Sequence, residues 1–227
     1  MAKIERHKRV NDILLGPLER PALKWLCARM PAWMTPDILT AIGFLGTLVT
    51  AAGYILCFID RGFLWLASLG LVINWFGDSL DGNLARYRHI ERPKYGYFVD
   101  HTIDAFSQVI IILGIGLSPY VQFEIACLGL IGYLLLGTVL FNRTHVTGVL
   151  VLSQSKLGPT EARALVILTN TLVFFTKNPH FKLPFTFYGI RTISLFDICT
   201  LILTFLLFYF AIRMTVIETI KLAKRGE

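Results

Sequence analysis

The sequence has few charged residues and no obvious linker. Of its 227 residues, 16% are Asp, Glu, Lys or Arg and 55% are hydrophobic, and its mean hydropathy is +0.62. An average soluble domain is about 25% charged. No polar stretch divides the chain and no internal repeat is visible. These shortages argue against a soluble two-domain protein and indicate a single-domain polytopic membrane protein. No signal peptide is expected, because the N-terminus is basic and polar for too long before the first apolar run.

Cysteine is scarce as well, and no C-x-x-C motif is present. The four copies are far apart in the chain: Cys27, Cys57, Cys127 and Cys199. Two or more of them fall in apolar segments. We therefore predict small buried apolar residues without a metal or redox role.

Long apolar runs, by contrast, are frequent. A membrane-spanning helix needs about 20 mostly apolar residues. Six segments qualify, of which the fifth is short and contains an Asn. They are Ile38–Ile59, Phe63–Leu84, Phe98–Leu117, Val121–Phe141, Thr160–Thr176 and Ile193–Val216. The predicted fold class is an all-α membrane protein, with six transmembrane helices and an N-terminal amphipathic interfacial helix. We divide it into an arm (1–35), a six-helix transmembrane domain that carries the candidate site (36–220) and a basic tail (221–227).

Basic residues are distributed unevenly around these segments. Eighteen Lys and Arg fall in the N-terminal arm, the second-to-third and fourth-to-fifth connections and the C-terminal end, and four fall on the other side. Because cytoplasmic loops carry an excess of Lys and Arg, both termini are predicted to be cytoplasmic. The net charge of +7 requires no nucleic acid, since the anionic membrane leaflet attracts basic segments.

The arm before the first apolar segment combines leucine with basic residues. Leucines and Trp25 alternate with Lys and Arg over residues 6–30. This pattern predicts an amphipathic helix lying on the membrane surface, broken near Gly16-Pro17 or at Pro21. A helix that binds a protein partner is the alternative. Thr35 and Pro36 then suit the cap and first position of the first spanning helix.

Four aspartates stand out against this apolar background. Asp78 and Asp81 lie near the end of the second apolar segment, and Asp100 and Asp104 lie near the start of the third. Spacings of three and four residues place each pair on one helix face. The short connection makes the two helices antiparallel neighbours, so the four carboxylates are expected to converge at one depth. Ionisable residues inside a membrane are costly, and they mark functional sites by default.

Converging carboxylates repel one another unless cations neutralise them. Oxygen ligands without clustered His or Cys favour Mg²⁺, Mn²⁺ or Ca²⁺ over zinc. Four carboxylates can hold two divalent ions, an arrangement that serves displacement at phosphorus. The residues therefore predict metal-dependent chemistry on a phosphate or pyrophosphate at the cytoplasmic face of the membrane. Nearby, Gly82 leaves space against its helix, and Arg86 has the chemistry to meet a phosphate. The alternatives are helix packing for Gly82 and an interfacial charge for Arg86.

The whole stretch reads D-x2-D-G-x2-A-R-x9-G-x3-D-x3-D. It resembles the signature of the CDP-alcohol phosphotransferase (CDP-alcohol phosphatidyltransferase) family. The matching positions are Asp78, Asp81, Gly82, Ala85, Arg86, Gly96, Asp100 and Asp104. The motif covers about 27 residues, and the six predicted spans and amphipathic arm agree with the family plan.

The resemblance implies a reaction and a set of roles. A hydroxyl attacks the β-phosphorus of a CDP-alcohol, and CMP is released with a phosphodiester of phospholipid biosynthesis. Mg²⁺ or Mn²⁺, with two ions expected, would be held by the four aspartates, and Asp104 is the best candidate for general base, beside Asp100. The donor's CDP moiety would contact Asp78, Asp81, Gly82, Ala85, Arg86 and Gly96. A homodimer embedded among membrane lipids is also expected by resemblance.

The identity of the two alcohols stays open. Ser79 after the first aspartate and His101 after the third are similar to the branch that uses CDP-choline or CDP-ethanolamine with diacylglycerol. A phosphate-bearing acceptor, typical of the branch that uses CDP-diacylglycerol, would instead be bound by basic and polar groups of the fourth-to-fifth connection. These acceptor candidates are Arg143, His145, Glu161 and Arg163. Positive-inside charge is an equal explanation for the two arginines.

Two other classes of protein also place charged residues in membrane helices. A membrane prenyltransferase would carry a second aspartate cluster in the later helices, where Asp197 stands alone. A transporter would place ionisable groups near the bilayer centre, in related halves. The aspartates here lie near one interface, so a phosphotransferase is the preferred hypothesis.

Overall fold

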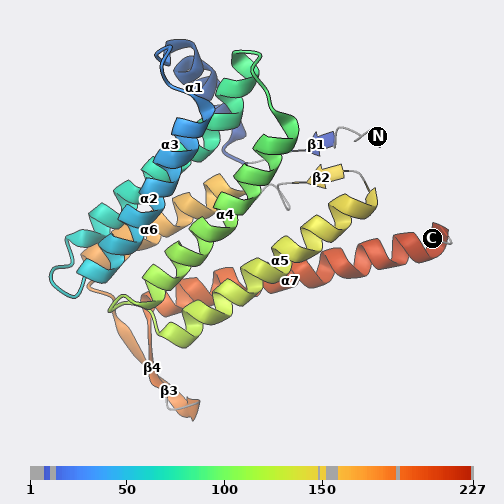
Figure 1. Ribbon diagram of the computed structural model, residues 1–227. Helices are drawn as coiled ribbons and strands as arrows, with labels where there is room; N and C mark the ends of the chain where they lie inside the picture. Colours follow the sequence, from blue (N-terminus) through green and yellow to red (C-terminus); the bar gives the residue numbers. More distant parts are fainter. Residues whose placement is uncertain (1–7, 11–13, 148, 152–157, 188–189, 226–227) are drawn as a thin grey trace.

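The computed structural model describes the chain except for residues 1–7, 11–13, 148, 152–157, 188–189 and 226–227. Seven helices make up most of the described part (Figure 1). They are α1 (Gly16–Arg29), α2 (Pro36–Leu56), α3 (Phe63–Tyr87), α4 (Pro93–Gly116), α5 (Phe123–Thr147), α6 (Pro159–Thr176) and α7 (Leu195–Arg225). The short strands are β1 (Lys8–Val10), β2 (Val149–Val151), β3 (His180–Phe187) and β4 (Ile190–Ser194).

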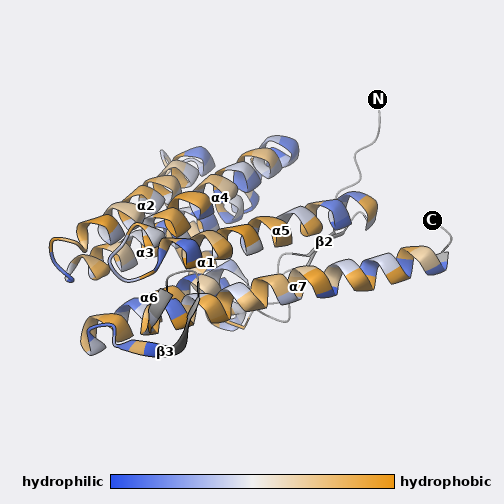
Figure 2. Cartoon of the chain, turned by 90° about the horizontal axis from the view of Figure 1, so that it is seen from below, coloured by the Kyte–Doolittle hydropathy of each residue, from blue (hydrophilic) through white to orange (hydrophobic). Residues whose placement is uncertain are grey.

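In the part of the chain that the structure describes, five helices are long and apolar enough to cross a membrane, namely α2, α3, α4, α5 and α7. Hydrophobic residues cover the middle of these helices, and hydrophilic residues gather toward their ends (Figure 2). The predicted fifth span does form a helix, α6, but α6 is not among the five. Its Glu161 accepts a hydrogen bond from Leu15 N at 2.8 Å beside α1, and its Phe174 ring lies 5.2 Å from the Arg61 guanidinium in the α2–α3 connection. Thus α6 runs alongside the bundle from one end to the other.

Glycines allow α2 and α3 to pack with their backbones in contact. A methyl group on Gly77 would overlap the backbone of Leu39 and Gly43, and one on Gly46 would overlap the backbone of α3. Close approach through small residues is a common way of associating helices in membranes. Two glycines of α5 also pack inside the chain, with Gly129 facing Thr204 and Gly132 facing Phe208. All four glycines serve contacts within one chain, and the homodimer stays a prediction.

The N-terminal helix α1 packs on the ends of α2 and α3. Leu23 and Cys27 are buried there with Leu39, Leu80 and Leu84. Burial raises the pKa of the Cys27 thiol, as expected for an unreactive cysteine, and the four cysteines form no disulfide. On its outer side, α1 exposes Leu18 and Trp25.

The helix start of α1 agrees with one of the two predicted break points. It begins at Gly16 with Pro17 in the first turn, and it continues through Pro21. A break at Pro21 was therefore wrong. A proline at this position removes one backbone donor, which would have bonded the carbonyl of Pro17, and α1 continues without it.

Two basic side chains fasten this end of the bundle. Arg88, at the C-terminal cap of α3, donates to the carbonyls of Met30 at 3.0 Å, Pro31 at 2.8 Å and Met34 at 2.5 Å. Arg92, just before α4, binds both carboxylate oxygens of Asp37 at 2.5 and 2.6 Å. The connection from α1 to α2 and the starts of α2 and α4 are therefore held together.

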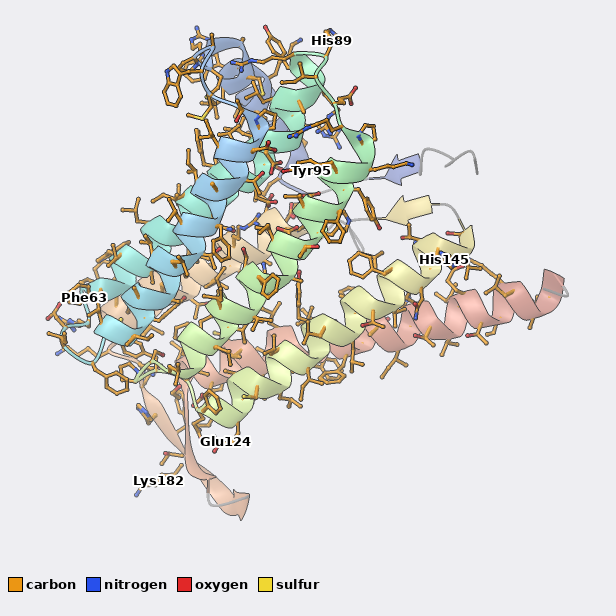
Figure 3. All side chains as sticks on the ribbon, viewed as in Figure 1. Phe63, His89, Tyr95, Glu124, His145 and Lys182 are labelled. Carbon is orange, nitrogen blue, oxygen red and sulfur yellow. The ribbon has the colours of Figure 1, made fainter. Side chains whose placement is uncertain are left out.

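The opposite end of the molecule carries a feature that the all-α prediction missed. Strands β3 and β4 pair as an antiparallel hairpin, which projects from the end opposite α1 (Figure 1). Figure 3 places His89 at the α1 end and Phe63 and Lys182 at the hairpin end. Buried Asp197 anchors the hairpin, since it accepts hydrogen bonds from Gln122 N at 2.8 Å and Ser194 N at 2.9 Å. The lone aspartate of the last apolar segment is thus a structural residue.

The last helix is longer than predicted. It continues beyond Val216 and through most of the predicted tail, and it lies beside α5 (Figure 1). An ion pair between Arg143 Nε and Glu218 Oε1 at 3.0 Å joins the two helices near their ends. Lys221 adds a second ion pair to Glu218 at 3.1 Å.

Candidate active site

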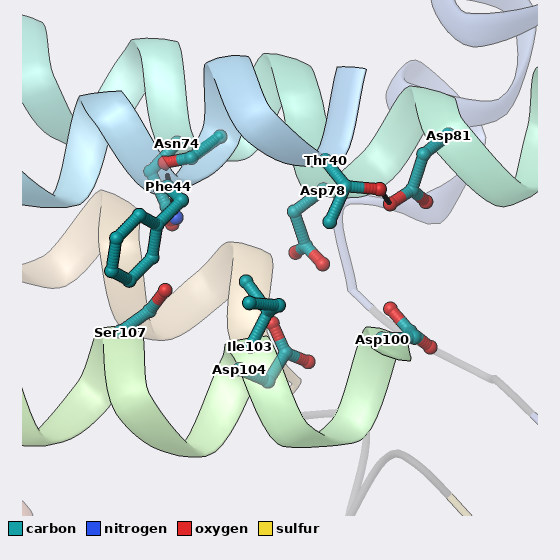
Figure 4. Close-up of a pocket in the computed structure, with 10 residues that line it drawn as sticks. Thr40, Phe44, Asn74, Asp78, Asp81, Asp100, Ile103, Asp104 and Ser107 are labelled. Atoms are coloured by element: carbon teal, nitrogen blue, oxygen red, sulfur yellow. Dashed lines mark hydrogen bonds between the residues drawn. The ribbon is translucent and has the colours of Figure 1, made fainter. Parts of the chain in front are cut away.

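The antiparallel helices α3 and α4 bring three of the four predicted carboxylates together. Asp78, Asp100 and Asp104 each offer an oxygen atom, and these atoms all lie within 4.8 Å of one another. Asp78 lies on α3 and faces the two aspartates of α4 across a small cavity (Figure 4). This spacing suits divalent cations that bind carboxylate oxygens, such as Mg²⁺ or Mn²⁺. We call these three residues, with Asp81, the carboxylate cluster.

The fourth aspartate, Asp81, lines the same cavity but is turned toward α2. Its Oδ2 accepts a hydrogen bond from Thr40 Oγ1 at 2.7 Å (Figure 4). Its Oδ1 accepts from the backbone N–H of Gly82 at 2.5 Å. Three residues along a helix correspond to slightly less than one turn, so Asp81 is displaced from Asp78 both along and around α3.

The cavity beside the cluster contains an unsatisfied polar group. Ser107 lies on α4 three residues beyond Asp104, and its side chain is buried. Two buried side-chain atoms, Ser107 Oγ and His101 Nδ1, lack a hydrogen-bond partner in the part of the chain that the structure describes. Buried polar groups usually have partners. Together with the carboxylate oxygens, this orphaned hydroxyl fits a site built for hydrated ions or a polar ligand.

Arg163 reaches the cluster from α6. Its Nη2 lies 2.6 Å from Asp78 Oδ2, and its Nε donates to Asn74 Oδ1 at 2.8 Å. The side chain is 7% exposed. The sequence indicated Arg163 as an acceptor-binding candidate, whereas the structure places it directly against a motif aspartate.

The other acceptor candidates lie elsewhere. Arg143 pairs with Glu218 of α7, and His145 is exposed near the end of α5 (Figure 3). Glu161 caps the start of α6, where it accepts from the backbone N–H groups of Gly158 at 2.9 Å and Leu15 at 2.8 Å. The structure therefore does not bring Arg143 and Arg163 to one phosphate, because α5 pairs with α7 while α6 packs against α3.

The remaining motif residues surround a larger opening. The guanidinium of Arg86 folds over Gly82, where a built Cβ would lie 3.3 Å from Nη1, and its Nη2 donates to Asn83 Oδ1 at 3.0 Å. A Cβ on Gly96 would meet no atom within 4 Å. With Ala85, these residues line a cavity of about 2440 Å³. Apolar side chains of α5, α6 and α7 make up much of the rest of its lining, so the polar cluster adjoins a largely apolar region.

His101 belongs to the same wall of this cavity. Its ring stacks on Tyr97 with centroids 4.2 Å apart and lies 5.5 Å from the Phe141 ring. The distance from His101 Nδ1 to Asp100 Oδ2 is 3.5 Å. In the sequence, His101 was only a hint of the donor branch, and the structure places it beside a cluster aspartate.

The arm supplies a residue to the surroundings of the site that the sequence did not suggest. Glu19 Oε1 of α1 accepts hydrogen bonds from Trp75 Nε1 at 2.8 Å, Ser79 Oγ at 3.2 Å and Thr160 Oγ1 at 3.0 Å. Ser79 follows Asp78, and Thr160 lies one turn from Arg163. The signal for Glu19 in the sequence was an acidic residue within a basic arm. Asn74 was missed as well, and its signal was a polar residue in an apolar helix, one turn before Asp78.

Fold and site together define a class: a multi-pass membrane protein whose helices hold a carboxylate cluster suited to divalent cations beside an apolar cavity. The chain belongs to the CDP-alcohol phosphatidyltransferase family, whose model matches residues 33–220. The family that the motif suggested is therefore confirmed.

Three relatives illustrate the breadth of the family. The chain is 38% identical over 92 residues to a phosphatidylinositol phosphate synthase of Cutibacterium acnes, covering 40% of this chain and 41% of the relative. It is 39% identical over 99 residues to an archaetidylinositol phosphate synthase of Pyrococcus horikoshii, covering 44% and 50%. It is 31% identical over 122 residues to cholinephosphotransferase 1 of Gallus gallus, covering 50% and 36%. The chain thus matches half or less of each relative's length.

A solved structure supports the fold. The crystal structure of Mycobacterium tuberculosis phosphatidylinositol phosphate synthase with CDP-DAG bound is similar with a TM-score of 0.55, covering 86% of this chain and 90% of that chain. The sequence identity is 19%, so this likeness concerns the fold alone.

Proposed function

We propose that this protein is an integral-membrane CDP-alcohol phosphotransferase of phospholipid biosynthesis. It transfers a substituted phosphate from a CDP-alcohol to an acceptor hydroxyl and releases CMP. The observation that carries the proposal is the convergence of Asp78, Asp100 and Asp104 within 4.8 Å, beside a cavity with a largely apolar lining. Such a cavity suits a reaction in which at least one of the two substrates is a lipid.

The cluster would hold Mg²⁺ or Mn²⁺ through Asp78, Asp81, Asp100 and Asp104. When bound, the ions neutralise the negative charge of the pyrophosphate and make its phosphorus more electrophilic. Gly82, Ala85, Arg86 and Gly96 line the cavity around the cluster. We assign them to contacts with the CDP moiety, for which the open space at Gly96 leaves room.

Asp104 would act as the general base on the acceptor hydroxyl. A bond forms between the hydroxyl oxygen and the β-phosphorus of the donor, and the bond from that phosphorus to the bridging oxygen breaks. CMP leaves with the electron pair of the broken bond, while the hydroxyl proton passes to Asp104.

We further propose that six helices cross the membrane and that the cluster faces the cytoplasm. The support is the end-to-end course of α6 and the excess of Lys and Arg on the side of the cluster. On this arrangement α1 lies in the membrane interface, with the exposed Leu18 and Trp25 turned toward lipid. A homodimer remains the expectation from the family resemblance.

The donor is either CDP-diacylglycerol or an amino-alcohol derivative, CDP-choline or CDP-ethanolamine. The relatives are named for inositol phosphate synthases and for cholinephosphotransferases, and these names support different branches. Ser79 and His101, the two hints from the sequence, both contact other residues of this chain. Both donor classes therefore belong in the test.

The test is CMP release by the purified protein in detergent with Mg²⁺ or Mn²⁺. One set of reactions contains CDP-diacylglycerol with pooled polar alcohols and their phosphates, and the other contains CDP-choline or CDP-ethanolamine with diacylglycerol. Asp104→Asn should abolish metal-dependent release in whichever set is active. Asp60→Asn is the matched control, since Asp60 caps Gly62 at the far end of the bundle. No CMP from either set and no bound Mn²⁺, in folded protein, would refute the proposal.

A further inference from the structure

Arg163 is a buried cation built into the carboxylate cluster. Its guanidinium is joined to Asp78 at 2.6 Å and is held on its other edge by Asn74 at 2.8 Å. Asn74 is itself fixed, because its Nδ2 donates to Gly43 O and Thr47 Oγ1, both at 3.1 Å. A chain of hydrogen bonds thus runs from α6 through α3 to α2 and fixes the direction in which Arg163 points.

The position of this cation matters because the cluster is strongly anionic. Carboxylates whose oxygens lie within 4.8 Å of one another repel each other when they are ionised. A guanidinium against Asp78 offsets part of this repulsion. The same guanidinium is bonded to the carboxylate of Asp78, one of the three carboxylates that could hold an ion. Arg163 and a bound ion would therefore compete for this carboxylate, and their positive charges would repel.

We propose that Arg163 is the resident counter-cation of the cluster. Without a divalent ion it stabilises the fold by pairing with Asp78. When an ion binds, Arg163 loses part of its attraction to the Asp78 carboxylate, and this loss weakens ion binding. The inference rests on the proposed metal-dependent function. It assigns Arg163 a positioning role toward the ion, which differs from the acceptor-binding role that the sequence suggested.

The two roles predict different results. A residue that only binds an acceptor phosphate would change the KM for the acceptor and leave ion affinity unchanged. A counter-cation would change ion affinity and the stability of the ion-free protein, with no substrate present. Ion binding and thermal unfolding without substrates therefore separate the two roles.

The experiment compares wild type, Arg163→Gln and Arg163→Lys in detergent. Mn²⁺ affinity is measured by electron paramagnetic resonance titration, and Tm is measured in EDTA and in saturating Mn²⁺. Arg163→Gln should bind Mn²⁺ about tenfold more tightly or better, because one positive charge beside the ion is removed. Its Tm in EDTA should fall, and its gain in Tm on adding Mn²⁺ should exceed that of wild type.

Arg143→Gln is the matched control. It removes the same charge and breaks a similar ion pair, at 3.0 Å to Glu218, but it lies away from the cluster. Its Mn²⁺ affinity should equal that of wild type. Equal tightening in both arginine variants would show a general charge effect and overturn the proposal. Unchanged or weaker Mn²⁺ binding in Arg163→Gln would also overturn it.

Arg163→Lys covers the case in which Arg163→Gln does not fold without an ion. Lysine keeps the charge but lacks the planar fork that spans Asn74 and Asp78. Because the charge is then held less firmly against Asp78, Mn²⁺ affinity should be tighter than that of wild type but less tight than in Arg163→Gln, and an unchanged affinity would contradict the proposal. If wild type itself binds no Mn²⁺, the proposed function fails as well. If wild type binds Mn²⁺ and releases CMP, only the role of Arg163 is in question.

Discussion

At the residue scale, Thr40 of α2 orients one carboxylate of the cluster through its hydrogen bond to Asp81, whereas the cluster itself lies on α3 and α4. Thr40 Oγ1 lies 2.7 Å from Asp81 Oδ2 and 3.1 Å from the carbonyl of Pro36. The hydroxyl can donate only one proton, and the shorter contact to the carboxylate takes it. Groups that orient a metal-binding carboxylate typically affect metal affinity or activity by about 10- to 100-fold.

Thr40→Val should therefore reduce CMP release by roughly 10- to 100-fold, with weaker Mn²⁺ binding and little change in Tm. Asp81→Asn should reduce it further. The control is Thr176→Val, which removes an exposed hydroxyl at the end of α6 that donates to Leu172 O in its own helix. Rates and Mn²⁺ titrations of the three variants would check this. A Thr40→Val protein as active as Thr176→Val would show that the α2 contact is dispensable.

The sequence could predict the residues that carry charge but could not predict their partners. The spacing of the four aspartates along two helices was enough to predict that Asp78, Asp100 and Asp104 meet, because helix geometry and a short connection dictate it. The partners Thr40, Asn74 and Arg163 come from helices whose rotation and depth depend on packing across the whole bundle. No local pattern encodes that packing.

At the scale of elements, the contact between α2 and α3 depends on the absence of side chains. Gly77→Ala would push a methyl group into the backbone of Leu39 and Gly43, and backbone cannot move aside as a side chain can. Overpacking typically costs about 1–3 kcal/mol. Because Gly77 directly precedes Asp78, the shift would also displace the cluster. Both Tm and CMP release should fall.

Gly137→Ala is the matched control for this change. Gly137 lies within α5, and a built Cβ meets no atom within 4 Å. Alanine favours a helix by about 1 kcal/mol over glycine, so the Tm of Gly137→Ala should be unchanged or slightly higher. Equal Tm values for the two variants would mean that α2 and α3 can move apart without loss of stability.

A second set of contacts between elements is made by Glu19, whose hydrogen bonds link α1 to α3 and α6. Its carboxylate accepts from three side chains, and hydrogen bonds to charged groups contribute about 1.5–3 kcal/mol each. Glu19→Ala should loosen α1, so trypsin should cleave faster after Lys24 and Arg29, which are exposed on this helix, and CMP release should decrease. Glu124→Ala, at an exposed glutamate of α5, should leave both unchanged. Equal cleavage rates in the two variants would contradict a clamp at Glu19.

The elements themselves were predictable to different degrees. Apolar runs longer than a membrane crossing fixed α2 to α5 and α7, because the bilayer requires such lengths. The β3–β4 hairpin was missed, since its segment follows directly on an apolar run and was considered only as a connection. The end of α7 was placed too early because charged residues beyond Val216 suggested a tail, whereas pairs such as Arg143 with Glu218 extend the helix.

At the scale of the whole molecule, the side of the membrane on which each end lies depends on α6. This helix has 18 residues, which span about 27 Å at 1.5 Å per residue, close to the hydrocarbon thickness of about 30 Å. Its polar residues Glu161 and Arg163 are buried within the protein, so they need not face lipid. Low apolarity therefore does not prevent α6 from crossing, because its neighbours satisfy its polar groups.

Single cysteines introduced by Lys94→Cys, Lys182→Cys and Lys224→Cys test this topology, in a background where the four native cysteines are replaced by alanine. The three lysines are exposed. With six crossings and a cytoplasmic cluster, an impermeant maleimide should label only the position-182 variant in intact cells, and all three after permeabilisation. If α6 does not cross, the hairpin stays on the side of the cluster and the end of α7 moves to the other. The position-224 variant would then be labelled in intact cells and the position-182 variant protected.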